Sequence, residues 1–171
     1  RCGHTCGKAV VDQAEAVARI RAAADARDEL RDRGGDILVL ARTDARATDG
    51  MEEALWRVEA FTRAGADILF LEAPKSEAEM RAFCAATDKP CMANMLEQGE
   101  TPILPPKVLE EIGYSLAAYP LTLLAAAMKA MQDALASFKA GEHPQDLLDW
   151  DSLRDVIGFN AYYAEEERYR D

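Results

Sequence analysis

The sequence lacks several features that would define its class at once. No apolar run approaches the roughly 18 residues of a membrane span, and no signal peptide opens the chain. There is no basic stripe: 20 basic residues stand against 31 acidic ones, so the net charge of -11 argues against nucleic-acid and anionic-membrane partners and otherwise fits ordinary solubility. The 4 cysteines are too few for a disulfide scaffold. We therefore predict a globular protein of the reducing cytoplasm.

What the chain does have is a set of short apolar runs. Its 171 residues are 49% hydrophobic, enough for the core of one domain. The run at 37–40 is continuous and aliphatic, with glycines before it and charges after it, as in a strand buried on both faces of a parallel sheet. Similar runs lie at 67–73, 90–97 and, more weakly, 114–120. The sequence therefore predicts roughly four parallel strands, the first of them buried on both faces.

Each apolar run ends in polar side chains. The positions Arg42, Glu72, Asn94 and Tyr119 follow one another at intervals of 30, 22 and 25 residues, close to the length of a βαβ unit. Between them the sequence predicts helices. Those expected are 10–33, 51–64, 77–87, 105–112, 121–140 and one or two within 147–169, with residues 46–50 as a polar loop. Asp12 and Ser76 are predicted N-caps, and the helix at 121–140 is apolar enough to be buried on more than one side.

The predicted fold class is α/β, the second half of a (β/α)8 barrel. A doubly wound sheet would also fit the alternation, but the glycine-rich phosphate fingerprint is missing. A complete barrel takes about 250 residues, so we expect further strands before Arg1, which is not a methionine. We predict a single partial domain over 1–171: an active-site loop at 1–9, βα units at 10–140 and a C-terminal helical extension at 141–171. Four strands alone would leave two open edges for pairing with another chain.

Five segments of the chain form a recognisable set: RCGHTCGK at 1–8, ARTDA at 41–45, LFLEAP at 69–74, ANMLEQGETP at 93–102, and YPL at 119–121 before an Ala- and Met-rich helix. Together they resemble the isocitrate lyase and phosphoenolpyruvate mutase superfamily. The sequence is most similar to the C-terminal half of the 2-methylisocitrate lyase and 2,3-dimethylmalate lyase group, alongside carboxyphosphonoenolpyruvate mutase-like proteins. The resemblance implies a barrel whose last helix swaps between subunits of a homodimer or homotetramer. It also implies an α-oxycarboxylate ligand on Mg²⁺ (or Mn²⁺).

The chemistry can be argued from the residues as well. Cleaving a carbon-carbon bond beside a hydroxyl leaves an enolate, which needs a cation on the developing charge and an acid for the carbon. Arg42 offers a bidentate fork for a carboxylate, or is a surface arginine paired with Asp44. Glu72 and Asn94 hold substrate oxygens or metal-bound water, or make structural hydrogen bonds. Cys2, with cations beside it, suits a thiol that donates a proton.

The resemblance assigns roles to matching residues. It makes Cys2 the proton donor on a loop that closes over the substrate. The predicted catalytic residues are Cys2, Arg42 and Glu72, and the predicted substrate-binding residues are Gly3, His4, Arg42, Glu72, Asn94 and Leu96. A zinc site at Cys2, His4 and Cys6 is the rival interpretation of the opening segment, but its spacing suits no common zinc motif.

The predicted function is a Mg²⁺-dependent lyase that cleaves a 2-hydroxy di- or tricarboxylate to a 2-oxo acid and a second carboxylate. The alternatives are an oxaloacetate decarboxylase or hydrolase, a phosphonomutase, and a non-catalytic barrel fragment or assembly module. By the resemblance, the metal ligands lie upstream of Arg1, so we expect the chain alone to be inactive. Ala125 stands where lyases of the tricarboxylate usually carry an arginine, which favours a smaller dicarboxylate.

Overall fold

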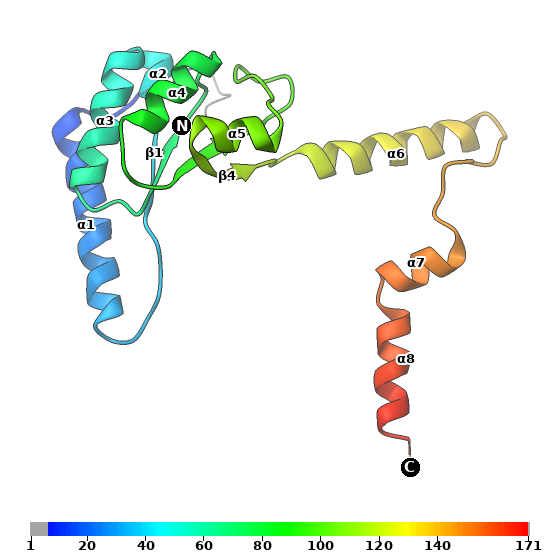
Figure 1. The fold of residues 1–171 in the computed structure, drawn as a ribbon. Coiled ribbons are helices and arrows are strands. Elements are labelled where there is room, and N and C mark those ends of the chain that lie inside the picture. The colour runs from blue at the N-terminus through cyan, green and yellow to red at the C-terminus, as the bar shows by residue number, and fades with distance from the viewer. Residues whose placement is uncertain (1–6, 171) are drawn as a thin grey trace. The chain divides into compact units, whose positions relative to one another are not determined.

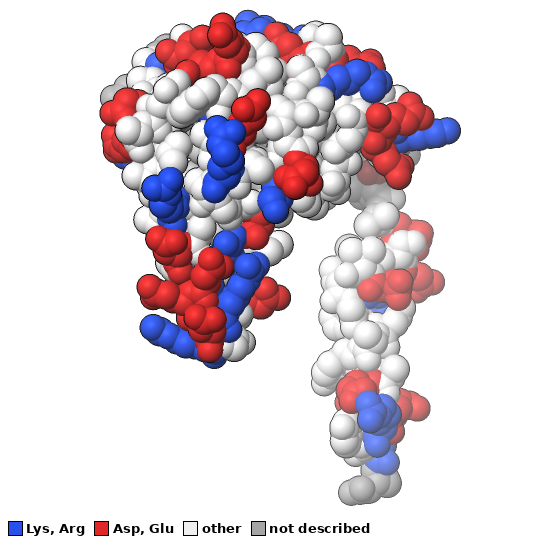
Figure 2. Space-filling view, turned by 60° about the vertical axis from the view of Figure 1, so that its left-hand side comes forward, with Lys and Arg blue, Asp and Glu red and all other residues white. Residues whose placement is uncertain are grey.

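The computed structural model describes residues 7–170 (Figure 1). They belong to two compact units, Arg1–Leu123 and Leu124–Asp171. The predicted boundaries at residues 9 and 140 stay a prediction. Figure 2 shows acidic and basic side chains interspersed on the visible face of the molecule, without a continuous basic stripe there.

The first unit contains a parallel sheet. Its strands are β1 (Leu40–Thr43), β2 (Ile68–Leu71), β3 (Cys91–Asn94) and β4 (Tyr114–Ala118), and they lie in chain order. All three pairings in this sheet are parallel, with Leu40 beside Ile68 and Cys91 beside Tyr114. This confirms the predicted α/β class. Because the strands are parallel, the polar residues that follow them meet at one rim.

Helices separate the strands of this unit. They are α1 (Gln13–Arg31), α2 (Ala45–Thr48), α3 (Met51–Arg63), α4 (Glu77–Ala85) and α5 (Pro106–Ile112). Both predicted N-caps are confirmed: Asp12 accepts the Glu15 N–H at 2.8 Å, and Ser76 Oγ accepts the Glu79 N–H at 3.2 Å. The loop predicted at 46–50 is wrong in its first half, because α2 turns once directly after β1.

The core lies between the sheet and the helices. Its largest fully buried side chains are Phe83, Leu69, Leu71, Met80, Met95, Val58 and Cys91. At the opposite end of the sheet from the rim, a buried arginine joins α1 to the strands. Arg27 Nη1 donates to Gly65 O at 2.7 Å and to Asp67 Oδ2 at 2.6 Å, and Asp67 accepts the Val39 N–H at 2.8 Å. These bonds fix the starts of β1 and β2 relative to α1.

The prediction of a strand buried on both faces at 37–40 is wrong. β1 begins only at Leu40, and Ile37 and Leu38 are 52% and 57% exposed. The physical reason is position, since β1 is an edge strand with a partner on one side within the described sheet. The apolar run marks a surface that the described residues leave uncovered.

The second unit consists of helices, which are α6 (Thr122–Lys139), α7 (Trp150–Val156) and α8 (Phe159–Arg168). The first of them, α6, has its first two residues in the first unit. None of the three carries a buried residue. The prediction that residues 121–140 are buried on several sides is therefore wrong for the chain as described, in which Leu123 is 83% exposed. None of the described helices is both long and apolar enough to span a lipid bilayer.

Candidate active site

Backbone hydrogen bonds continue past the ends of the four strands at the rim of the sheet. The Glu72 N–H donates to Thr43 O at 3.0 Å, which extends the ladder between β1 and β2 by one residue. The Met95 N–H donates to Ala118 O at 2.8 Å and does the same for β3 and β4. These bonds hold the backbone of Glu72 and of its neighbours in register, so side chains from successive strands converge at one edge.

Arg42 and Asp44 form a bidentate pair at the end of β1. Arg42 Nε and Nη2 donate to the two Asp44 carboxylate oxygens at 2.7 and 2.9 Å, and Lys8 Nζ lies 2.8 Å from Asp44 Oδ1. Partial burial alone would raise the pKa of the Asp44 carboxyl, but the hydrogen bonds from Arg42 and Lys8 outweigh it and lower that pKa. The pairing with Asp44 that was one interpretation of Arg42 is therefore present. Asp44 stays ionised and fixes the plane of the guanidinium.

The guanidinium of Arg42 also contacts two residues of the neighbouring strand and its end, Phe70 and Glu72. Its Cζ lies 5.1 Å from the centroid of the Phe70 ring, and its Nη2 lies 3.5 Å from Glu72 Oε2. The second contact is an ion pair too long for a good hydrogen bond. Arg42 thus lies between two carboxylates, one tightly bound and one loosely.

Glu72 is the unusual residue of the rim. It is 4% exposed, and its Oε2 has no hydrogen-bond donor among the described residues. A buried carboxylate oxygen without a donor costs the folded state free energy, and such atoms in native proteins call for an explanation, such as a ligand that supplies the missing bond. We therefore expect Glu72 Oε2 to accept a hydrogen bond from a ligand or from another group outside the described residues.

A small cavity of about 50 Å³ opens beside this carboxylate. It has room for one or two water-sized groups. Its lining residues are Glu72, Ala73, Asn94, Leu96, Gly99, Glu100 and Thr101. The predicted residues Glu72, Asn94 and Leu96 thus line one cavity, and Arg42 contacts the first of them.

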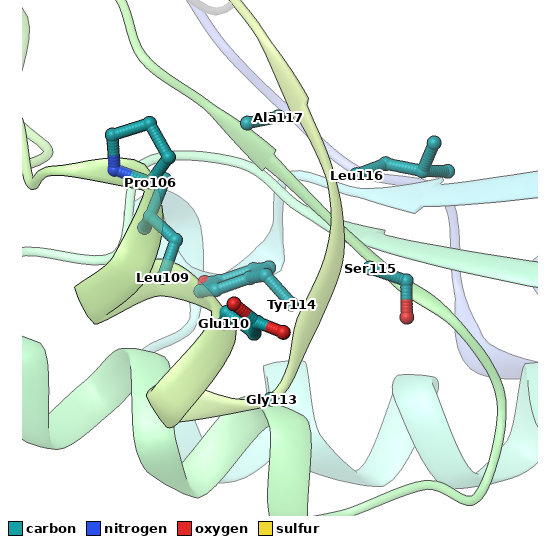
Figure 3. A pocket seen from close by; sticks show the side chains of 8 residues that line it. All are labelled: Pro106, Leu109, Glu110, Gly113, Tyr114, Ser115, Leu116 and Ala117. Atoms are coloured by element: carbon teal, nitrogen blue, oxygen red, sulfur yellow. The ribbon is translucent and has the colours of Figure 1, made fainter.

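A larger hollow of about 550 Å³ lies elsewhere, along α5 and β4. Figure 3 shows its walls, formed by side chains such as Leu109, Tyr114 and Leu116. None of the predicted site residues lines it. The hollow therefore belongs to the open edge of the sheet rather than to the candidate site.

The backbone beside the small cavity is strained at two positions. Within residues 7–170, the non-glycine residues with positive φ are Ala73 at 55° and Gln98 at 61°. Ala73 directly follows Glu72, and Gln98 directly precedes the lining residue Gly99. Such backbone conformations cost about 1 kcal/mol or more and cluster at functional sites. Sequence reasoning missed both, because an alanine or glutamine carries no signal of the left-handed conformation.

The described residues do not form a metal site by themselves. Over residues 7–170 there is no group of three or more His, Cys, Asp or Glu side chains that could hold a metal ion. Glu72 Oε2 could accept a bond from a water on an ion bound nearby, which is compatible with Mg²⁺ held mainly by other residues. The predicted residues Cys2, Gly3 and His4, and the zinc alternative that adds Cys6, lie outside the described part of the chain.

Parallel βα units with an arginine and carboxylates at the carboxyl ends of the strands are typical of the (β/α)8 barrel class. The family model described as phosphoenolpyruvate phosphomutase matches residues 3–139, and the chain belongs to this family. The structure is accordingly the second half of such a barrel.

Curated relatives and solved structures agree with this membership. The chain is 36% identical to 2,3-dimethylmalate lyase of Eubacterium barkeri over 99% of its length, and 38% identical to the probable 2-methylisocitrate lyase 2 of Corynebacterium glutamicum over 98%. These matches cover 58% and 54% of the relatives, so the chain spans about half their length. Among solved structures, oxaloacetate acetylhydrolase in complex with 3,3-difluorooxalacetate matches with a TM-score of 0.84 and 30% identity, covering 98% of this chain and 56% of that one.

Proposed function

We propose that the protein to which this chain belongs is a Mg²⁺-dependent carbon-carbon lyase. It would cleave a 2-hydroxy di- or tricarboxylate, of the dimethylmalate or methylisocitrate kind, to a 2-oxo acid and a second carboxylate. The observation that carries the proposal is the buried Glu72 oxygen, which no described residue supplies with a hydrogen bond and which lies 3.5 Å from the Arg42 guanidinium at the rim of the sheet. The two lyase relatives support the reaction class.

Each residue of the rim has its own role in the proposed reaction. Arg42, held in plane by Asp44, binds a substrate carboxylate and stabilises the negative charge that develops as the carbon-carbon bond breaks. Glu72 and Asn94 orient the substrate oxygens, and the side chain of Leu96 closes the cavity. Cys2 returns a proton to the carbon. Mg²⁺, with ligands from outside this chain, supplies further positive charge when bound.

Glu72→Gln in the whole protein tests the role of the buried carboxylate. The amide keeps the shape but removes the charge, so we expect kcat/KM to fall at least about 100-fold. The melting temperature should change little, because the amide keeps the shape of the side chain and Arg42 keeps its bidentate pair with Asp44. The matched control is Glu77→Gln at an exposed pair with Arg81, which should leave activity unchanged. Full activity of the Glu72 variant would overturn the proposal.

A second candidate is an enzyme acting on oxaloacetate, either as a hydrolase or as a decarboxylase. It is favoured by the oxaloacetate acetylhydrolase neighbour and by Ala125, which offers no cation for a third carboxylate. A carbon-phosphorus mutase is the remaining family alternative. Product analysis on a panel of substituted malates, methylisocitrate, oxaloacetate and phosphoenolpyruvate, with and without Mg²⁺, separates these reactions. The chain alone should turn over none of them.

The proposal extends to assembly and location. Leu124, Met128, Met131, Leu135 and Phe138 repeat along α6 at alternating steps of four and three, the spacing of a helix that packs against another helix. All five are exposed in the described chain. We therefore propose a homodimer or homotetramer of the cytoplasm that forms through the C-terminal helices. A chain that assembles but never binds substrate or metal would be an assembly module instead of an enzyme.

A further inference from the structure

Lys8 lies at the candidate site, although no motif of the sequence pointed to it. Its Nζ is 2.8 Å from Asp44 Oδ1, and the two side chains are only 13% and 18% exposed. Asp44 is also the carboxylate that binds the Arg42 guanidinium through two hydrogen bonds, at 2.7 and 2.9 Å. Lys8 therefore contacts the residue that orients Arg42, in an ion pair that salt screens less than it screens pairs on the open surface.

The backbone that follows Lys8 is tied to α3. Arg57 Nη2 donates to Val11 O at 2.7 Å, and Arg57 Nε donates to one oxygen of Glu53 at 2.7 Å. Gln13 Nε2 donates to the other Glu53 oxygen, also at 2.7 Å. Val11 packs against the hydrophobic core as well. The position of the chain just after Lys8 is thus set by contacts that belong to the fold itself.

The charges around Arg42 indicate what Lys8 adds. Asp44 and Glu72 are both paired with the Arg42 guanidinium, tightly in the first case and at 3.5 Å in the second. One cation between two carboxylates would leave an excess of negative charge, which repels an anionic ligand, and this repulsion is stronger in a partly buried site than in water. Lys8 supplies a second cation, so that cations and carboxylates are equal in number within this group of four side chains.

We propose that Lys8 is a positioning residue of the candidate site, which acts through Asp44 to let Arg42 bind a substrate carboxylate. The Lys8 ammonium offsets the charge of Asp44, while Asp44 holds the guanidinium in plane. The inference rests on the proposed function for the class of ligand, an anionic carboxylate. Because that carboxylate has the same charge before and during bond cleavage, Lys8 stabilises the bound substrate and the transition state alike, and its loss should change KM rather than kcat.

Lys8→Met in the whole protein tests this role. We expect the dissociation constant of oxalate, a dicarboxylate used as the probe in isothermal titration calorimetry with Mg²⁺ present, to rise at least about tenfold. The KM of the substrate identified by product analysis should rise by a similar factor, with kcat within about threefold of the parent. Lys8→Arg keeps the charge and should restore both constants to within about threefold. Lys89→Met, an exposed site before β3 at the other end of the sheet, is the matched control and should change neither.

The contact itself can be measured without a variant. When the folded protein is treated with a small amount of acetic anhydride, Lys8 should be acetylated at least about fivefold more slowly than the exposed Lys89, as quantified by mass spectrometry. Equal rates would contradict the shielded ion pair with Asp44 and overturn the proposal, even if Lys8→Met failed to fold.

The binding and kinetic results can also refute the role of Lys8. An unchanged oxalate dissociation constant in Lys8→Met, or a Lys8→Arg variant as weak as Lys8→Met, would overturn it. A fall in kcat as large as the fall in kcat/KM would show general disruption of the site instead of lost carboxylate binding. A parent protein that binds oxalate but turns over no substrate would refute the lyase and leave the oxalate constants to decide on Lys8, whereas a parent that binds no oxalate would overturn carboxylate binding at Arg42.

Discussion

At the scale of single residues, the candidate site contains two features that cost the fold free energy. Glu72 buries a carboxylate oxygen that has no hydrogen-bond donor within residues 7–170, and the next residue, Ala73, has a φ of 55°. Both line the same small cavity. Two adjacent residues of one cavity each lower the stability of the folded chain. We infer that their conformation is retained because it serves ligand binding.

Ala73→Gly should stabilise the chain. Glycine adopts positive φ without the clash of a Cβ, so we expect the free energy of unfolding to rise by about 1 kcal/mol. Ala78→Gly, on the exposed face of α4, is the matched control and should lower it by a similar amount. Thermal or urea unfolding measures both, and an Ala73→Gly variant less stable than the parent would show that the alanine is not strained.

The sequence predicted which residues meet at the rim but not how they are held. Arg42, Glu72 and Asn94 could be found because each follows an apolar run at the spacing of a βα unit. The contacts of Lys8 with Asp44, and of Glu100 and Thr101 with the cavity, could not. These contacts depend on how the loops fold over the rim, and the periodicity of apolar residues in a sequence carries no information on loop conformation.

At the scale of elements, the start of α4 shows the limit of local patterns. The N-cap at Ser76 was predictable, but Glu79 does not turn back onto it as a capping box would. Glu79 Oε2 accepts the Lys75 N–H at 2.8 Å, and the two Glu79 oxygens bind Arg46 of α2 at 2.9 and 2.6 Å. α2 and α4 are thus tied by residues far apart in the sequence, a pairing that only the tertiary fold defines.

This pair predicts a pH-dependent contribution to stability. The hydrogen bond from Arg46 is the largest cause that lowers the pKa of the Glu79 carboxyl below its usual value of about 4.3. A lowered folded pKa stabilises the protein above that usual value, and this stabilisation is lost as the pH falls through the folded pKa. Arg46→Met should therefore cost about 1 kcal/mol at pH 6 and progressively less toward pH 3, measured by urea unfolding across pH.

Arg63→Met is the control for Arg46→Met. Arg63 and Glu59 form an exposed ion pair at 3.6 Å, and its loss should change stability by less than about 0.5 kcal/mol at any pH. An equal cost of Arg46→Met at pH 6 and pH 3 would contradict the assignment.

At the scale of the whole molecule, the uncovered apolar surfaces matter most. The sequence predicted buried apolar residues at 37–40 and 121–140, and both segments are exposed in the described chain. The patterns themselves are those of buried elements. The apolar patterns could be recognised from the sequence, but the exposure of the two segments in the described chain could not.

Assembly through α6 can be tested by charge. Met131→Glu with Leu135→Glu places two carboxylates in the apolar repeat, and we expect the oligomer to dissociate by at least one step in analytical ultracentrifugation. Gln132→Glu adds a charge to the same helix outside the repeat and should leave the sedimentation coefficient unchanged. If the double variant keeps the parental oligomer, another surface holds the subunits together.

The order of the strands has a consequence for how the protein is made. Each strand pairs with the strand next to it in the chain, at a separation of roughly 30 residues or fewer. Contacts that close such short loops form early and rapidly. As the polypeptide leaves the ribosome, each new βα unit can dock onto the edge left by the one before it, and the nascent sheet grows without waiting for distant segments.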